Sequence, residues 1–311
     1  MLALAVTCRG HCNQIFATPE SDRETTLDAA GAQMVRQGEP MNKTVRIILI
    51  CLLTGVFIYA GYMLLGETQE YRDAEEIYEA SRRTFVLLEA MPDSSDAVTV
   101  GTLTEEEPVV FPNVQIDFDT LVETNEEIIA WIWVPETNIS FPLLKTADNM
   151  KYIHLSYNLQ YNSSGAIFVD ARNSAQFTDD NSIIFGHNMK NGTMFGSLKN
   201  YREQDYLAGH KAIFVFTPEK AFMYEVFAAY ETDAVSEVYT CMFGTEERSI
   251  IEGMVNTMEN SEYLDMIKAN TLIESDIWPE TGERLITLST CAVDWNSRFV
   301  VHGVLIAEKD M

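Results

Sequence analysis

The sequence predicts a mainly β fold: eight strands in a closed or nearly closed barrel, with helices before it and one helix inserted before the last two strands. Three observations support this. Short runs rich in β-branched and aromatic residues recur along the second half of the chain, separated by turn-forming residues. Leu285–Cys291 and Arg298–Ile306 flank a short polar loop, which is typical of a hairpin. Ser249–Ala269 has helical spacing and interrupts the strands just before this hairpin.

The first ordered element expected is a membrane anchor. Ile47–Gly66 is a run of twenty residues without a charge, and a helix of about that length spans the roughly 30 Å hydrocarbon core of a bilayer. Lys43 and Arg46 precede the run and acidic residues follow it, which places the N-terminus in the cytoplasm and the larger C-terminal part outside the cell. The alternative is a cleaved signal peptide, but Leu64–Glu67 is a poor cleavage site. We therefore predict a single-pass anchor over residues 41–66.

Residues 1–40 show no apolar periodicity. The segment that starts at Met41 has the composition of the natural opening of an anchored protein, so residues 1–40 are either a cytoplasmic tail or a mis-assigned start. Cys8, His11 and Cys12 are metal-ligand residue types, but no second ligand pair lies near them. We expect no metal there.

Helices are expected between the anchor and the strands. Glu70–Met91 is rich in helix formers and has apolar residues at helical spacing, as in a stalk or a helix packed on the domain. Pro92–Pro112 mixes acidic residues with Ser, Thr and Pro, as linkers do. Phe118–Ala130 predicts a second helix, with a further turn starting at Asn125. Residues 67–113 are thus a helical stalk and linker, and residues 114–311 form the main domain, which holds the strands.

Six strands are expected before the hairpin, each a short run rich in β-branched and aromatic residues. They are Trp131–Val134, Ile139–Leu144, Gly165–Val169, Ser182–Phe185, Ala212–Phe216 and Ala221–Ala229. With the hairpin they make eight strands, enough to close a barrel.

Charge and cysteine usage exclude several classes of function. The net charge is −26, and the part after residue 66 carries 16 basic and 42 acidic residues. Such a surface repels nucleic acid, which we exclude as a partner. Only Cys241 and Cys291 follow the anchor, so there is no disulfide framework. A bridge between them is conceivable but would block the thiol of Cys291, and Cys241 is expected to be a small buried residue. No phosphate loop, dinucleotide fingerprint or paired metal-ligand spacing occurs, so no cofactor is expected.

Three residues supply the parts of an acyl-transfer site. The hairpin places Cys291 at the end of one strand and Arg298 at the start of its neighbour, and His187 follows an apolar run and Gly186 about a hundred residues upstream. A thiol nucleophile, a histidine acid or base and an anion-stabilising guanidinium are what transfer through a thioester requires. Each residue alone is more often part of the packing or the surface, so the combination carries the prediction.

These residues also carry a family resemblance. Thr287–Cys291 (TLSTC) with Arg298 resembles the TLxTC…R signature of sortases, the cysteine transpeptidases of Gram-positive cell surfaces. Phe185–Leu198 is similar to the extended histidine motif of the class B branch, and Trp131–Pro142 resembles the opening block of the family. The resemblance implies an eight-stranded sortase-type β-barrel and, for class B, a helix where Ser249–Ala269 lies.

The resemblance also implies roles. Cys291 would be the nucleophile, and His187 would protonate the leaving amine and then activate the incoming one. Arg298 would stabilise the oxyanion or hold the substrate backbone. Asp294 is the alternative third member, as an orienter of His187, but the family pattern assigns the role to arginine, and we expect Asp294 to be a solvated loop charge.

Candidate substrate contacts are less sharply defined. Ser289 lies on the same strand face as Cys291 by alternation, and Asn149 lies where class B enzymes place a substrate-binding asparagine. Phe185 stands where class B members often carry tyrosine, so a hydroxyl is absent there. The candidate substrate-binding residues are Ser289, Asn149, Thr290, Ile250 and Thr240, with Thr245 as an alternative to Thr240. His154, His210 and His302 form no ligand set, and His302 is expected to be structural.

The predicted function is that of a membrane-anchored, class B-like sortase that joins surface proteins bearing a C-terminal sorting signal, NPxTN-like or (S/N)PxTG-like, to a peptidoglycan amine. Its partners would be those surface proteins, a peptidoglycan precursor or cross-bridge amine, and the membrane through residues 47–66. Another sortase class, a pilin-joining sortase and a catalytically silent anchored binding domain are the alternatives. The presence of Cys291, His187 and Arg298 together argues against the silent domain.

Overall fold

The computed structural model describes residues 42–88, 97–98, 109–234, 236–244, 247–248, 255–256, 258–291 and 297–311. The chain divides into two compact units, residues 1–59 and residues 60–311. The described part of the first unit is helical, and the second unit holds the barrel. The predictions for residues 1–40 lie outside the described residues.

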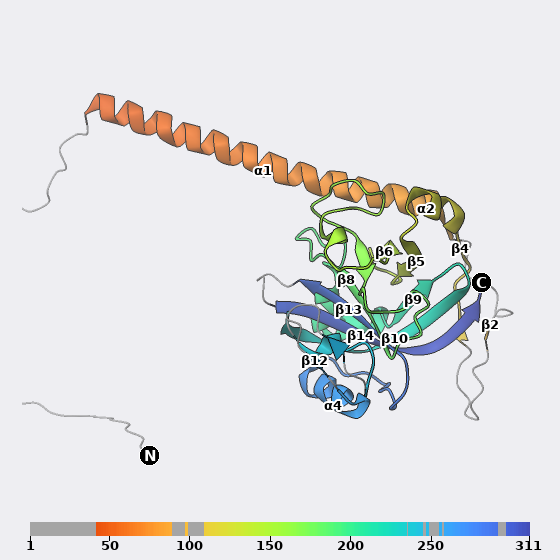
Figure 1. The fold of residues 1–311 in the computed structure, drawn as a ribbon. Coiled ribbons are helices and arrows are strands. Elements are labelled where there is room, and N and C mark those ends of the chain that lie inside the picture. Colours follow the sequence, from red (N-terminus) through yellow and green to blue (C-terminus); the bar gives the residue numbers. More distant parts are fainter. Residues whose placement is uncertain are drawn as a thin grey trace, which may run out of the picture. The chain divides into compact units, whose positions relative to one another are not determined.

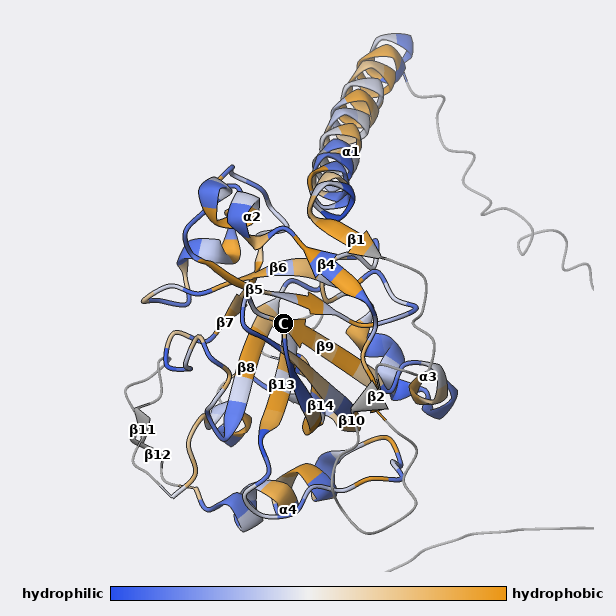
Figure 2. Ribbon diagram, turned by 90° about the vertical axis from the view of Figure 1, so that its right-hand side faces the viewer, coloured by the Kyte–Doolittle hydropathy of each residue, from blue (hydrophilic) through white to orange (hydrophobic). Residues whose placement is uncertain are grey.

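α1 (Lys43–Phe85) is one continuous helix, so the predicted anchor and stalk form a single element. Large apolar side chains from Val45 to Leu65 are exposed along it, and Figure 2 colours much of this part of the helix as hydrophobic. Among the described residues, α1 is the helix whose length and composition suit a membrane crossing, a criterion that a signal sequence would also meet.

The stalk helix predicted over Glu70–Met91 is too long, because α1 ends at Phe85. Val86–Leu88 forms β1, which pairs antiparallel with β4 (Val114–Ile116). The N–H of Asp117 donates to the carbonyl of Phe85 over 3.0 Å, which fixes the point where the chain leaves the helix. Part of the predicted linker is also ordered, since β2 (Ala97–Val98) pairs with β3 (Val109–Val110).

Eight strands close the barrel in the order β10-β14-β13-β8-β7-β6-β5-β9, which confirms the predicted fold class. The β6–β7 and β8–β13 pairs are parallel, and the other described pairs in the barrel are antiparallel. Figure 1 shows the strands gathered around one interior. The bounds are β5 Ile128–Trp133, β6 Ser140–Leu144, β7 Ile167–Val169, β8 Asn181–Gly186, β9 Ala212–Phe216, β10 Lys220–Asp233, β13 Leu285–Cys291 and β14 Ser297–Asp310.

The barrel forms because its strands bury apolar side chains on both faces, inside the barrel and against the segments that cover it. Trp131, Ile132 and Phe141 are each at most 2% exposed, and burial of such a side chain contributes roughly 1.5–3 kcal/mol. α3 (Gln204–Gly209) and three 3-10 turns connect the strands: η2 (Lys151–Ile153), η3 (Leu198–Arg202) and η4 (Glu237–Tyr239).

The helix predicted over Phe118–Ala130 is wrong in its second half. α2 covers Phe118–Thr124 and ends at Asn125, whose backbone is extended. The buried Asn125 amide donates to the Tyr152 hydroxyl and the Tyr157 carbonyl, each over 2.8 Å. These bonds hold the chain out of the helix, so the residues from Ile128 onward join β5 instead.

The inserted helix is also shorter than predicted. α4 covers Asn260–Asn270, whereas Val255–Asn256 within the predicted range forms β12 and pairs with β11 (Glu247–Arg248). The apolar spacing that predicted an earlier start reflects burial, because Met258 packs in the same cluster as Leu264 and Ile267. Glu259 has an extended backbone and marks the helix start.

His302 lies beside the cluster of Met258, Leu264 and Ile267 and is structural, as predicted. It is fully buried, its ring packs 5.4 Å from the ring of Tyr230, and its Nδ1 lies 3.0 Å from the Thr287 hydroxyl. The Thr287 hydroxyl donates in turn to the Asn181 side-chain oxygen over 2.8 Å. This chain of hydrogen bonds ties β14, β13 and β8 together on the face that packs against α4, where Asn181 also donates to the Tyr263 hydroxyl.

Burial lowers the pKa of His302 from its ordinary value of 6.5 to about 3. Between these two values the unfolded chain binds a proton that the folded chain does not, so the free energy of unfolding falls as the pH falls, by up to about 1.4 kcal/mol per unit. His302→Gln should be less stable at pH 7.5 but should lose less stability between pH 6 and pH 4.5. Urea unfolding of the parent and the variant at pH 7.5, 6 and 4.5 measures these free energies. Equal losses of stability between pH 6 and pH 4.5 in the two proteins would contradict the prediction.

Candidate active site

The candidate catalytic residues lie at one end of three neighbouring strands. β8 and β13 run in the same direction with Thr290 opposite Gly186, so the next residues along the two strands are Cys291 and His187. β14 runs antiparallel along the other edge of β13 and pairs Arg298 with Cys291. Since neighbouring strands lie about 4.8 Å apart, the topology brings these three backbones together.

Gly186 allows the end of β8 to pack closely against two neighbouring side chains. A Cβ at this position would lie 2.5 Å from Cδ1 of Ile167 and 2.8 Å from the ring of Phe195. A larger residue would therefore have to displace these side chains or the strand end that carries His187. Packing explains the glycine of the histidine motif.

The loop that follows His187 folds back on itself. The N–H of Phe195 donates to the carbonyl of His187 over 3.0 Å, and Asn188 forms a β-bridge with Met194. His187 thus lies at the base of a hydrogen-bonded loop, which we call the histidine loop (Asn188–Phe195).

The imidazole of His187 is held by a backbone carbonyl. Its Nε2 lies 2.7 Å from the oxygen of Ile153. A carbonyl only accepts hydrogen bonds, so Nε2 carries the hydrogen in both the neutral and the charged ring. Nδ1 is therefore the ring nitrogen that can exchange a proton with a reacting group.

Burial lowers the pKa of His187 below its ordinary 6.5, while the bond to the Ile153 carbonyl acts in the opposite direction. Electrostatic repulsion from His154 and Arg298 lowers the pKa of His187 further. The rings of His154 and His187 stack with centroids 6.3 Å apart. At neutral pH the resting His187 is therefore mainly neutral.

Arg298 is half-buried and close enough to His187 for its charge to act there. Its Nη1 donates to the carbonyl of Ser297 over 3.3 Å. A guanidinium stays protonated throughout the working pH range, so it supplies a permanent positive charge at the strand end where Cys291 lies.

Ser289 and Thr290 are both buried, each 1% exposed. The Ser289 hydroxyl lies 2.9 Å from the hydroxyl of Tyr239, and the Tyr239 ring packs 5.7 Å from that of Phe185. Tyr239 thus contacts both strands two residues before their catalytic candidates. It supplies a phenol near the position where Phe185 lacks one.

Asn149 is half-buried and holds the loop before η2 in place. Its side-chain oxygen accepts from the N–H of Ala171 over 2.8 Å, and Lys145 donates to the carbonyl of Ala171 over 2.9 Å. Asn149 lies four residues before Ile153, the residue that holds His187. Its contact with substrate stays a prediction.

Thr240 lies near the other end of β8. Its hydroxyl donates to the carbonyl of Glu237 over 2.8 Å, and its carbonyl accepts from the side chain of Asn181 over 2.9 Å. Asn181 begins β8 and is six residues, roughly 20 Å at 3.3 Å per residue, from His187. Thr240 has a structural task there, and its contact with substrate stays a prediction.

Cys241 is buried, as predicted, and its carbonyl accepts from the N–H of Asn181 over 3.0 Å. Leu285 pairs with Asn181, and Cys291 lies six residues further along β13, again roughly 20 Å away. Bridged cysteines need Cα atoms within about 7 Å. The strand register therefore excludes a bridge between Cys241 and Cys291. The predictions for Ile250, Thr245 and Asp294 lie outside the described residues.

Three residues that contribute to the candidate active site were not predicted from the sequence. Ile153 acts through its carbonyl, which every residue has. His154 was considered only as a metal ligand, and its place beside His187 depends on how η2 folds. Tyr239 lies in a segment without periodicity. The sequence therefore does not reveal that its hydroxyl lies beside that of Ser289. No three His, Cys, Asp or Glu side chains gather as a metal site in the part of the chain that the structure describes.

Comparisons with known proteins agree with this fold. The sortase domain family matches residues 132–306. The chain is 28% identical to sortase B of Listeria monocytogenes over 263 residues, which cover 84% of this chain and 96% of that protein. It is similar in fold to the sortase B–substrate complex of Staphylococcus aureus, with a TM-score of 0.54 and 28% identity over 61% of this chain and 84% of that one. A structure of sortase B complexed with triglycine matches with a TM-score of 0.53 and 27% identity, over 61% and 85% of the two chains.

Removal of the Arg298 charge should raise the pKa of His187, because a nearby cation disfavours the imidazolium. Titration of the imidazole by NMR in Arg298→Gln measures the change. Arg284→Gln is the matched control, since Arg284 precedes the opposite end of β13 and pairs with Glu308. An unchanged or lower pKa in Arg298→Gln would contradict the assigned electrostatic contact.

Proposed function

The chain belongs to the sortase family, and from that premise we propose that it is a membrane-anchored class B sortase with Cys291 as nucleophile, His187 as acid and base, and Arg298 as the oxyanion-stabilising cation. The observation that carries this proposal is the register of β8, β13 and β14, which brings the three residues to neighbouring strand ends.

In the first step, the Cys291 thiol gives its proton to Nδ1 of His187, and the sulfur attacks the carbonyl carbon of a threonine in the sorting signal. The carbonyl oxygen becomes negative in the tetrahedral intermediate, and the guanidinium of Arg298 stabilises that charge. The carbon–nitrogen bond then breaks, and Nδ1 of His187 gives its proton to the departing amine. The surface protein stays on the enzyme as a thioester.

In the second step, a peptidoglycan amine attacks the thioester carbon. His187, now neutral, takes a proton from the attacking nitrogen through Nδ1. The carbon–sulfur bond breaks, a new amide joins the surface protein to the cell wall component, and the thiol regains its proton. No cofactor or external oxidant is needed for either step.

The relatives support the proposed substrate classes. The Staphylococcus aureus structure is a sortase B–substrate complex, and another sortase B structure holds triglycine. For this chain we propose a peptide signal of the NPxTN-like or (S/N)PxTG-like kind and an amine acceptor. The apolar half of α1 supports a membrane anchor with an extracellular catalytic domain.

The acyl transfer can be tested by intact mass spectrometry of the full-length chain in detergent, mixed with a panel of sorting peptides and no added amine. We expect an adduct with the mass of the peptide fragment up to the threonine, because the thioester accumulates when no amine resolves it. Cys291→Ala should form none. A folded protein with a reactive thiol that forms no adduct with any peptide would count against the proposed transpeptidase.

The assignment of Arg298 over Asp294 makes a second prediction. Arg298→Ala should lower kcat by about 10²–10³-fold, the usual effect of removing an oxyanion donor. Asp294→Ala should change kcat by no more than a few-fold. Steady-state transfer of a fluorescent peptide to an amine measures both. Near-normal turnover in Arg298→Ala together with loss in Asp294→Ala would reverse the two roles.

A further inference from the structure

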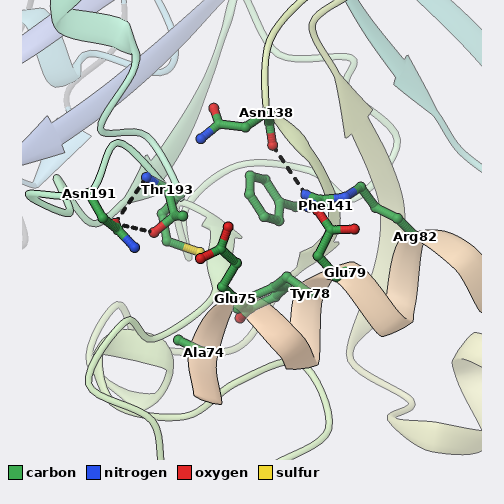
Figure 3. Close-up of a pocket in the computed structure, with 10 residues that line it drawn as sticks. Ala74, Glu75, Tyr78, Glu79, Arg82, Asn138, Phe141, Asn191 and Thr193 are labelled. Carbon is green, nitrogen blue, oxygen red and sulfur yellow. Dashed lines mark hydrogen bonds and ion pairs between the residues drawn. The ribbon is translucent and has the colours of Figure 1, made fainter. Parts of the chain in front are cut away.

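The end of α1 and the histidine loop meet at one residue, Asn138, in the turn between β5 and β6. Figure 3 shows Asn138 between Arg82 of α1 and the side of the histidine loop that carries Asn191 and Thr193. The turn is itself well ordered, because the N–H of Val134 donates to the carbonyl of Ile139 over 2.9 Å. Asn138 is thus a fixed point between two separate segments.

The Asn138 side chain uses both ends of its amide on the histidine loop and the residues just after it. Its nitrogen donates to the carbonyl of Gly192, at the tip of the loop. Its oxygen accepts from the Ser197 hydroxyl over 3.0 Å, beyond the base of the loop. Since the loop closes on the carbonyl of His187, one amide holds its tip and its base in a single arrangement.

Arg82 holds Asn138 from the other side. Its Nη1 donates to the backbone carbonyl of Asn138 over 3.3 Å. The same guanidinium pairs with Glu79 and lies 5.7 Å from the centre of the Phe141 ring. These contacts orient the Arg82 guanidinium on α1. A shift of α1 would therefore also move the turn that holds Asn138.

A second route joins α1 to the imidazole itself. The buried Tyr78 hydroxyl donates to the carbonyl of Gly165 over 2.5 Å. Gly165 has φ of +57°, and a Cβ there would lie 2.5 Å from the carbonyl oxygen of Ile153. Gly165 therefore packs directly against the group that accepts the Nε2 hydrogen of His187. Two residues, Gly165 and Ile153, thus connect the Tyr78 hydroxyl to the His187 ring.

A cavity of about 120 Å³ lies between this part of α1 and the histidine loop. It is lined by polar side chains that include Glu75, Arg82 and Asn138, and also by the apolar Ala74, Phe141 and Met194. Packing here is incomplete, so the hydrogen bonds of Asn138 add to the contacts that connect the helix to the loop.

We propose that Asn138 is a positioning residue for His187, and that the last turns of α1 hold both Asn138 and the Ile153 carbonyl in their working places. The same helix that carries the predicted membrane anchor is then part of the support of the active site. In its kinetic consequences this inference rests on the proposed transpeptidase function.

Two variants of the full-length chain test the proposal. Asn138→Ala removes both bonds to the histidine loop and its surroundings, and Tyr78→Phe removes one hydroxyl while the ring keeps its contacts with Phe141 and Tyr157. Each should lower kcat by about 10–100-fold, since small misplacements of a catalytic group have effects of that size. KM should stay within about two-fold of the parent, since neither residue is assigned a contact with substrate.

Matched controls separate positioning from general destabilisation. Glu75→Gln changes a side chain in the same cavity, and Tyr71→Phe removes a hydroxyl from the same helix, and both should keep the parental kcat. In a His187→Ala background, Asn138→Ala should cause no further loss in the residual labelling rate of the Cys291 thiol, because its effect passes through His187.

A readout that needs no turnover keeps this inference separate from the proposed function. With ¹⁵N-labelled histidine, Asn138→Ala and Tyr78→Phe should both shift the His187 imidazole signals and its pKa, and leave His302 unchanged. Absence of any thioester in the parent, with these shifts present, would refute the transpeptidase but support the positioning role. Unchanged kcat and unchanged His187 signals in both variants would overturn the positioning role, even if the thermal stability of the variants fell.

Discussion

The parallel pairing of β8 with β13 is the constraint on which the rest of the site depends. Parallel strands join only through a crossover, and here about a hundred residues separate the two. Their register sets Thr290 opposite Gly186. As a result, the next residues, Cys291 and His187, lie side by side at the same end of the two strands. A slip by one residue would turn every side chain of one strand to the other face. The catalytic arrangement is therefore a property of the sheet register.

Buried polar groups in the interior fix that register. The Thr287 hydroxyl bonds to Asn181 of β8 and meets Nδ1 of His302 on β14, and the Asn181 amide also reaches the Tyr263 hydroxyl. These groups satisfy one another in only one alignment of the strands, and a buried polar group left unpaired costs about 1–3 kcal/mol. Nε2 of His302 has no hydrogen-bond partner among the described residues, which agrees with a ring held neutral by burial.

The sequence was sufficient to predict the barrel, the hairpin of Cys291 and Arg298, and the strand that ends at Gly186, because these depend on local alternation and on motifs. It failed where distant contacts override local preference. Asn125 leaves a helical pattern because Tyr152 and Tyr157 offer its amide partners. The hydrogen bond that holds His187 could not be predicted either, because its acceptor is the backbone carbonyl of Ile153, and every residue has such a carbonyl.

His187 is subject to opposing demands, and the structure resolves them in favour of a neutral resting ring. Burial lowers the pKa of His187 from its ordinary value, so the neutral ring predominates at neutral pH. The charged form is needed only when an amine departs, and a thiolate or oxyanion nearby then favours it. The Ile153 carbonyl contributes in both states, because Nε2 donates to it whether or not Nδ1 is protonated. The ring can therefore gain and lose its proton without turning, which a residue that acts first as acid and then as base requires.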